Sequence, residues 1–124
     1  MNNAINYSFI LLTIILTVYG QVVIKWQVIR AGDFPSELFE RTSFLLHLII
    51  NPWIISALLA AFIAALSWMV AMTKFDLSHA YPFMSLSFIF VLIFSGFILK
   101  EPVTTYKILG LIIIIIGILV GSKG

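Results

Sequence analysis

The sequence predicts an all-α membrane protein with four transmembrane helices and an interfacial helix between the first two. Hydrophobic residues make up 62% of the 124 residues, charged residues only 10%, and the mean hydropathy is +1.17. These values lie far outside the average for soluble domains. Apolar runs of about 20 residues recur along the chain, and a helix of that length crosses the ~30 Å hydrocarbon core of a bilayer. We therefore predict a single integral membrane domain over residues 1–124.

Four apolar runs define the predicted spans, at approximately residues 5–24, 52–72, 79–99 and 104–120. No Lys or Arg precedes the first run, so a cleaved signal peptide fits poorly and we expect this span to be retained. The chain has no cysteine, which excludes disulfides and cysteine-ligated zinc. Its 7 basic and 5 acidic residues form no block of like charge, so the sequence indicates no nucleic-acid partner.

A polar stripe follows the first span. Thr13, Thr17, Gln21 and Lys25 recur every four residues, so successive side chains drift by only about 40° around a helix. One interpretation is that these groups form hydrogen bonds between helices. The other is a polar wall that leads to a cation, and both stay open at this point.

Residues 35–50 are predicted to form an interfacial helix along the lipid headgroups, because apolar residues repeat here at helical spacing. The opposite face is polar and carries Glu37, Glu40, Arg41 and His47. Pro35 suits the first turn of such a helix. Asn51 and Pro52 then mark a break and a restart, with Asn51 as the cap of the second span and Pro52 at its first position. The alternative is an extension of the second span towards the N-terminus.

The second span is predicted to serve mainly in helix packing, because small residues recur along it at close-packing intervals. They are Ser56, Ala57, Ala60, Ala61, Ala64, Ala65, Ser67 and Ala71. In the third span, Ser78 is a candidate cap, and Pro82 stands near the start, where a missing backbone donor costs little. This span is expected to place Tyr81 and Ser85 near one face.

The fourth span carries three glycines on one side, Gly110, Gly117 and Gly121, and the last two form a GxxxG pair. We interpret this face as a contact between two protomers. Packing within one chain is the alternative.

The basic residues are distributed unequally between the two membrane surfaces. One surface receives Lys25, Arg30, Arg41, Lys100 and Lys107, and the other receives Lys74 and Lys123. The excess favours the first surface being cytoplasmic, with both termini outside.

None of the predicted spans contains Asp or Glu. A proton-coupled exporter of cations needs an intramembrane carboxylate that binds the proton and the substrate alternately, so the sequence argues against that mechanism. It also shows no metal-ligand spacing, no nucleophile paired with a base and no cofactor motif, which argues against an enzyme. Lys25, Arg30 and Lys100 share one surface and suit a phosphate-bearing headgroup better than a cation. Topology determinants and lipid anchors are the alternative roles of such bases.

Several short motifs resemble a known family. They are Gly20-Gln21 with Lys25, Ala80-Tyr81-Pro82 with Ser85-Leu86 and Phe88, and Glu101-Pro102-Val103 before a glycine-punctuated last span. The pattern resembles the small four-span members of the drug/metabolite transporter superfamily, and within it the subunits of the 4-amino-4-deoxy-L-arabinose-phosphoundecaprenol flippase. The likeness is weak over residues 27–50.

The small multidrug resistance exporters are a related family of similar length and span count. Aligned on Gly20 and Lys25, the chain has Thr17 where those exporters carry an essential Glu. It also has Ser85-Leu86-Ser87-Phe88 in place of their glycine-rich kink in the third span. Both differences argue against drug/proton exchange.

The flippase resemblance implies a dimer of four-span subunits, formed with itself or with a similar chain, in a bacterial inner membrane. Its cargo would be an undecaprenyl-phosphate-linked sugar moved to the periplasmic leaflet, with the polyprenyl tail left among membrane lipids. Lys25 and Lys100 would attract the phosphate, and a polar groove for the sugar would consist of Thr13, Thr17, Gln21, Tyr81 and Ser85. Two other functions remain open: an exporter of a cationic or small metabolite substrate, and an accessory membrane subunit that transports nothing.

Overall fold

The chain folds into helices joined by short loops. A computed structural model describes residues 2–124, with side chains from Ala4 onward. The elements in order are α1 (Asn2–Ala31), α2 (Leu38–Ile49), α3 (Pro52–Met72), α4 (Leu77–Ala80), the 3₁₀ helix η1 (Tyr81–Leu86), α5 (Ser87–Phe97) and α6 (Thr105–Gly121).

Three segments of the described chain are long and apolar enough to cross a membrane: Ala4–Ala31, Pro52–Met72 and Leu77–Phe97. The helix α6 is equally apolar but shorter, and its rise of about 26 Å lies at the lower limit for a span. Large apolar side chains are exposed along all of these helices, which suits a lipid environment. The chain is therefore a multi-pass, all-α membrane protein, and the predicted fold class is confirmed.

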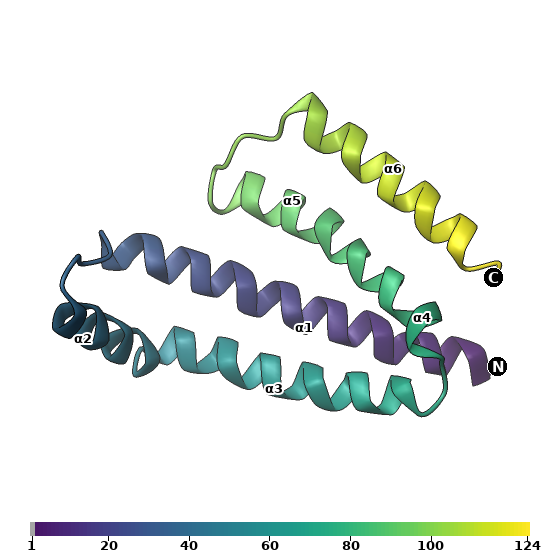
Figure 1. The fold of residues 1–124 in the computed structure, drawn as a ribbon, viewed down its shortest axis with the longest axis horizontal. Helices are drawn as coiled ribbons and strands as arrows, with labels where there is room; N and C mark the ends of the chain where they lie inside the picture. The colour runs from purple at the N-terminus through teal and green to yellow at the C-terminus, as the bar shows by residue number, and fades with distance from the viewer. Residues whose placement is uncertain (1) are drawn as a thin grey trace.

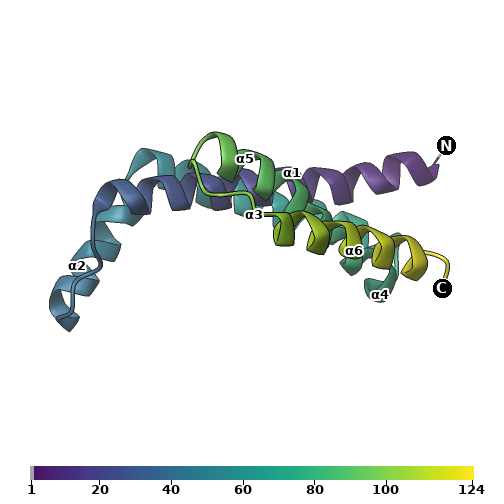
Figure 2. The same cartoon turned by 90° about the horizontal axis from the view of Figure 1, so that it is seen from above.

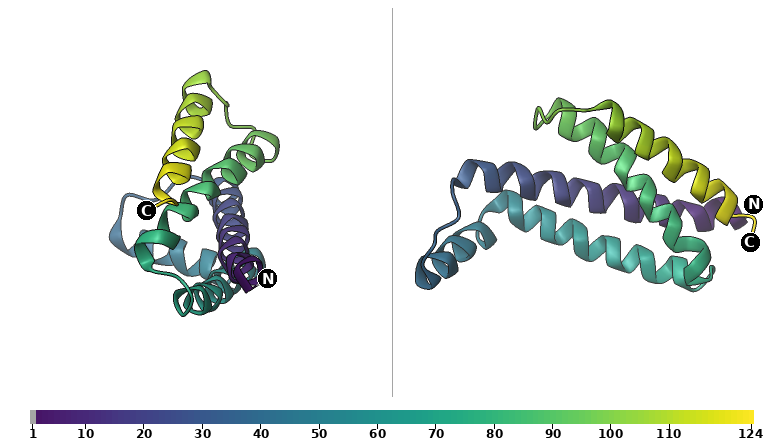
Figure 3. Two further views of the ribbon diagram at one scale, coloured as in Figure 1. Left: turned by 90° about the vertical axis from the view of Figure 1, so that its right-hand side faces the viewer. Right: turned by 45° about the horizontal axis from the view of Figure 1, so that its top comes forward.

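The helix α1 lies at the centre of the arrangement (Figure 1). It runs antiparallel to α3 over most of its length and contacts α5 on another side. The helix α6 packs mainly on η1. The end-on view in Figure 3 shows α6 on the far side of α5 from α3, and both termini lie at the same end of the molecule.

Three points of the contact between α1 and α3 lie seven positions apart on α1, at Thr13, Gly20 and Gln27. The Thr13 hydroxyl donates to the Ala64 carbonyl at 3.4 Å. A Cβ added to Gly20 would lie 3.2 Å from the Ala57 carbonyl oxygen, so the two backbones approach closely there. The Gln27 amide oxygen accepts from Asn51 at 3.0 Å. A seven-residue repeat is typical of two helices packed at a shallow crossing angle.

All residues of the buried face of α3 except Ile54 are small, which explains the close approach. Its members are Ile54, Ala57, Ala60, Ala64, Ser67 and Ala71. Lipid tails are as apolar as leucine, so helices in a bilayer associate through van der Waals packing of such small side chains rather than through the hydrophobic effect. The prediction that this span serves mainly in packing agrees with the buried face of α3.

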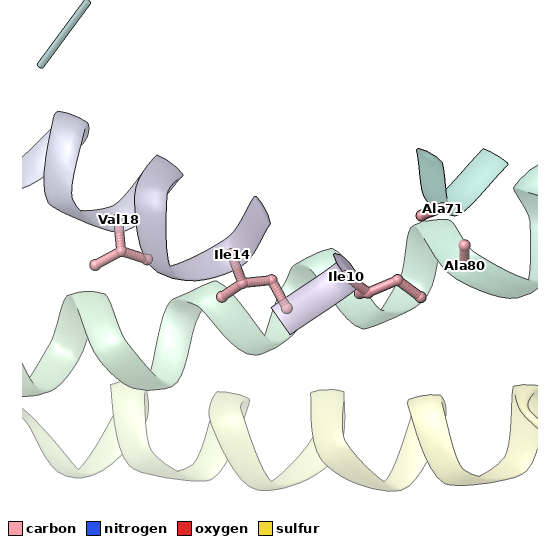
Figure 4. Packing of buried hydrophobic residues seen from close by; sticks show 5 residues of the cluster. All are labelled: Ile10, Ile14, Val18, Ala71 and Ala80. Carbon is pink, nitrogen blue, oxygen red and sulfur yellow. The ribbon is translucent and has the colours of Figure 1, made fainter. Parts of the chain in front are cut away.

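The apolar core of the bundle follows α1 and ends where α3 turns back. Ile10, Ile14 and Val18 form a row on α1, and Ala71 and Ala80 lie beyond Ile10 at the end of that row (Figure 4). Ile14 is only 1% exposed. Aromatic and aliphatic side chains from α3, η1 and α5 surround this row, so the core joins three parts of the chain.

The helix α1 is longer than the predicted first span, because it continues past residue 24 to Ala31. It ends before Gly32, whose φ of +93° favours glycine. Pro35 then lies in a loop, so its predicted place in a helical turn is wrong, and α2 begins at Leu38. Figure 2 shows α2 bending away from the long axis of the other helices.

The start of α3 follows the sequence prediction. The Asn51 side chain accepts a hydrogen bond from the backbone N–H of Trp53 at 2.8 Å, and Pro52 takes the first helical position. The helix α6 is capped in the same manner, since the Thr104 hydroxyl accepts from the backbone N–H of Lys107.

The third predicted span is interrupted by the 3₁₀ helix η1. Pro82 has no backbone N–H and its ring opposes a regular α-helix, so the chain tightens there to 3₁₀ geometry. The segment begins at the N-cap Asp76, and the predicted cap Ser78 lies within α4. His79 ties this segment to α1, because its Nε2 is 2.8 Å from the Tyr7 hydroxyl.

The close approach at Gly20 leads to a testable prediction. Gly20→Val forces a side chain against the Ala57 carbonyl, so we expect the free energy of unfolding of the detergent-solubilised monomer to fall by about 1–3 kcal/mol. Gly117→Val is the matched control, since a Cβ there meets nothing within 4 Å. Equal unfolding curves for the two variants would contradict this account of the α1–α3 contact.

Candidate functional site

A cavity of about 320 Å³ lies between α1, α3 and the start of η1. Its polar lining comes from Thr13, Thr17, Gln21 and Tyr81, together with the indole of Trp68. Alanines of α3 supply the opposite wall, and their short side chains leave the space open. Four of the seven residues expected to bind substrate therefore share one cavity.

The burial of the stripe changes along α1. Thr13 is 4% exposed, Thr17 is half-buried, and Gln21 and Lys25 are exposed. This gradient follows from the drift of about 40° per step, which rotates the stripe out of the α3 contact. The stripe thus begins in the helix contact and ends at the protein surface.

The two interpretations of the stripe apply to different residues. The Thr13 hydroxyl lies 2.8 Å from the Phe9 carbonyl and 3.4 Å from the Ala64 carbonyl, so it serves helix packing. Gln21 is exposed at the cavity, where its amide is free to face a ligand or a partner chain. Thr17 lies between these two positions.

Tyr81 and Met84 line the same cavity, whereas Ser85 does not. In a 3₁₀ helix, residues three apart lie on the same side, so Met84 and not Ser85 follows Tyr81 on the cavity side. The prediction for Ser85 assumed α-helical periodicity through Pro82. The proline was the signal in the sequence that could have shown the difference.

Trp68 is a cavity residue that the sequence analysis missed. Its ring packs edge-on against Tyr81, with 6.2 Å between the ring centroids. Tyr81 is 64% exposed, so the pair forms an aromatic rim where the cavity opens to the surface. An amphipathic rim of this kind suits the stacking of a sugar or the end of an apolar chain.

The two lysines expected to attract phosphate lie apart from the cavity lining. Lys25 is exposed on α1, and Lys100 is exposed in the corner between α5 and α6. The C-terminal halves of α1 and α5 point towards the same end of the molecule, so both lysines belong to that end (Figure 1).

Lys100 adopts a left-handed backbone conformation with φ of +56°. The backbone N–H of Glu101 donates to the Ser95 carbonyl at 3.0 Å, and the Lys107 ammonium donates to the Pro102 carbonyl at 2.9 Å. These bonds close the end of α5 and turn the chain into α6. A residue other than glycine is strained in this conformation.

The glycine face of α6 makes no close contact within the described chain. A Cβ added to Gly110, Gly117 or Gly121 would meet no heavy atom within 4 Å, and Gly117 and Gly121 are exposed. Packing of these glycines within one chain therefore has no support in the structure.

The fold is that of a small multi-pass membrane protein, and comparison with known proteins gives its family. The model of the EamA-like transporter family matches residues 3–122, so this chain belongs to that family. The resemblance noted from the short motifs is confirmed.

Three similar proteins carry the same printed name, probable 4-amino-4-deoxy-L-arabinose-phosphoundecaprenol flippase subunit ArnE. The protein of Pseudomonas fluorescens (strain Pf0-1) is 31% identical over 111 residues, which cover 88% of this chain and 90% of that protein. The protein of Aeromonas salmonicida (strain A449) is 30% identical over 110 residues, covering 89% and 90%. The protein of Pseudomonas aeruginosa (strain LESB58) is 28% identical over 116 residues, covering 90% and 91%. No solved structure matches the chain significantly.

Two substitutions at Lys100 separate the effect of its charge from the effect of its backbone conformation. Lys100→Gly relieves the left-handed strain and Lys100→Val increases it, while both remove the ammonium group. We expect the valine variant to be less stable than the glycine variant by about 1–2 kcal/mol, measured by unfolding in detergent. Indistinguishable stabilities would show that the corner relaxes without cost.

Proposed function

We propose that this protein is a subunit of a flippase that moves an undecaprenyl-phosphate-linked sugar across the bacterial inner membrane. The observation that carries the proposal is the gathering of Thr17, Gln21 and Tyr81 in one laterally open cavity within apolar helices. The names of the similar proteins support the same cargo class.

The cavity chemistry suits the hydroxyl groups of a sugar. Hydroxyl and amide side chains both donate and accept hydrogen bonds, as sugar hydroxyls require. No acidic residue lines the cavity, so the carboxylate with which a proton-coupled exporter would bind a cation is missing from it. The lining therefore suits the hydroxyl groups of a sugar, and it offers no carboxylate to a cationic drug.

The open side of the cavity gives the cargo its route in this proposal. The sugar enters between Gln21 and the Trp68–Tyr81 rim, while the polyprenyl tail stays in the surrounding lipid. Polar groups at this depth offset the cost of taking sugar hydroxyls through hydrocarbon. Lys25 and Lys100 hold the phosphate at their end of the bundle, where it stays near water.

The assembly is a dimer in this proposal, formed by two copies or by this chain and a similar one. The cavity between α1, α3 and η1 holds only about 320 Å³, at the small end of the usual range for ligand pockets, and a second chain would complete its wall. The glycine face of α6 is available for that contact because small residues allow helix backbones to approach closely.

The cavity assignment is tested by two variants. Gln21→Leu removes the amide at constant size, and Ala61→Leu fills the space beside it. We expect each to slow translocation of a lipid-linked sugar in proteoliposomes by about fivefold or more, the effect of losing roughly 1 kcal/mol of hydrogen bonding or shape fit.

The matched control for this test is Phe62→Leu, next to Ala61 but on the lipid-exposed surface. It should leave translocation and folding unchanged. Wild-type translocation in both cavity variants would remove the cavity from the transport path.

The dimer assignment has its own test. Gly117→Leu together with Gly121→Leu should weaken dimerisation, seen as a larger monomer fraction by crosslinking in dilute detergent. Leu119→Ala, on the opposite side of α6 from the glycine face, is the control and should dimerise normally. Full dimerisation of the double glycine variant would assign the interface to another helix.

A further inference from the structure

A second cavity lies where α2 bends away from the end of α1. It is distinct from the cavity between α1, α3 and η1 that we propose for the sugar, called the sugar cavity below. Its volume is about 770 Å³, within the ~300–1,000 Å³ typical of small-molecule sites. Its lining residues come from α2 and from the region where α1 stops and α3 starts. Figure 2 shows α2 at that end of the bundle. No residue of this cavity lines the sugar cavity.

The wall formed by α2 combines three polar side chains with aromatic and aliphatic ones. Glu40, Ser43 and His47 are spaced by three and four residues and line the cavity together. The other side of α2 exposes Leu38, at 80%, and Ile49. An amphipathic helix of this kind places its apolar face in the bilayer and its polar face at headgroup level.

The ring of His47 has a defined orientation. Its Nδ1 lies 2.8 Å from the Ser43 carbonyl oxygen, which can only accept, so Nδ1 carries the proton. The Nε2 atom at the other side of the ring remains available to a ligand. The orientation of the ring is thus fixed by a hydrogen bond within its own helix and not by a contact with another element.

The wall formed by α1 carries a positioned cation. The Arg30 guanidinium stands over the Trp26 ring at 5.6 Å from the centroid, and Arg30 lines the cavity. Behind it, Gln27 is 6% exposed and is hydrogen-bonded to Asn51. Since Asn51 also caps α3, the inner wall is fixed by the same contact that starts that helix.

We propose that this cavity binds a zwitterionic phosphodiester headgroup that carries a primary ammonium. Arg30 pairs with the phosphate, Glu40 pairs with the ammonium, and the Ser43 hydroxyl and His47 Nε2 complete the hydrogen bonding. The lining holds one basic and one acidic side chain besides the histidine, so a headgroup with both charges matches it.

Alternative headgroups match less well. A purely anionic headgroup would leave Glu40 opposing its charge, and a quaternary ammonium would offer no N–H to the carboxylate. The exposed apolar side of α2 indicates that the source is a membrane phospholipid rather than a free phosphate ester. The site therefore serves to hold α2 and the end of α1 at the membrane surface, beside the path of the cargo.

The probe for this site is phosphatidylethanolamine. The full-length protein is reconstituted in nanodiscs with equal amounts of phosphatidylethanolamine, phosphatidylglycerol and phosphatidylcholine, then released, and the lipids that remain bound are counted by native mass spectrometry. We expect phosphatidylethanolamine to be retained in preference to the other two. Arg30→Gln and Glu40→Gln should each lower its retention by roughly threefold to tenfold, as for one partly exposed charged hydrogen bond.

Two neighbouring charges provide matched controls. Arg41 stands over the Phe34 ring and bonds the Pro35 carbonyl, and Glu37 is the N-cap of α2; neither lines the cavity. Arg41→Gln and Glu37→Gln should retain phosphatidylethanolamine as the wild type does. Equal retention of the three lipids, or equal loss in all four variants, would overturn the proposal.

The source of the headgroup is separated by competition with soluble phosphoethanolamine. Failure of a large excess to displace the bound lipid supports a site for membrane phospholipid. Complete displacement would overturn the assignment to a membrane lipid, because the same chemistry would then bind from water.

Discussion

The close packing of α1 on α3 is the constraint on which the rest of the structure depends. Gly20 and the alanines of α3 allow the two backbones to approach, and hydrogen bonds at Thr13 and Gln27 add to the contact. In a bilayer, this van der Waals packing must hold the helices together, because the hydrophobic effect that stabilises a soluble core does not act between helices in lipid. The position of α1 between α3 and α5 follows from it.

The candidate site is a consequence of the same contact. A polar stripe with a four-residue repeat cannot stay on one face of an α-helix, so it leaves the contact gradually between Thr13 and Lys25. Where it leaves, small α3 side chains face it and a cavity remains. The helix contact and the proposed cargo site therefore use neighbouring positions of one stripe. Membership of the EamA-like transporter family agrees with a site of this kind.

Much of the fold could be predicted from the sequence because apolar length, caps and small-residue spacing are local signals. The start of α3 at Asn51 is an example. Features that depend on how the chain packs were missed. The 3₁₀ geometry after Pro82 moved Met84 to the cavity in place of Ser85, and His47 gained neighbours only through the bend of α2. Trp68 was missed because an aromatic residue within an apolar run resembles any other.

The central claim is that the cavity between α1, α3 and η1 holds the sugar of a lipid-linked cargo. The most direct measurement is photo-crosslinking with a polyprenyl-phosphate-linked sugar that carries the reactive group on the sugar, followed by mass spectrometric mapping. The account predicts adducts at Trp68, Tyr81 and Met84 that unlabelled cargo prevents. Adducts confined to the lipid-exposed surface of α3 or α6, or adducts insensitive to competing cargo, would contradict it.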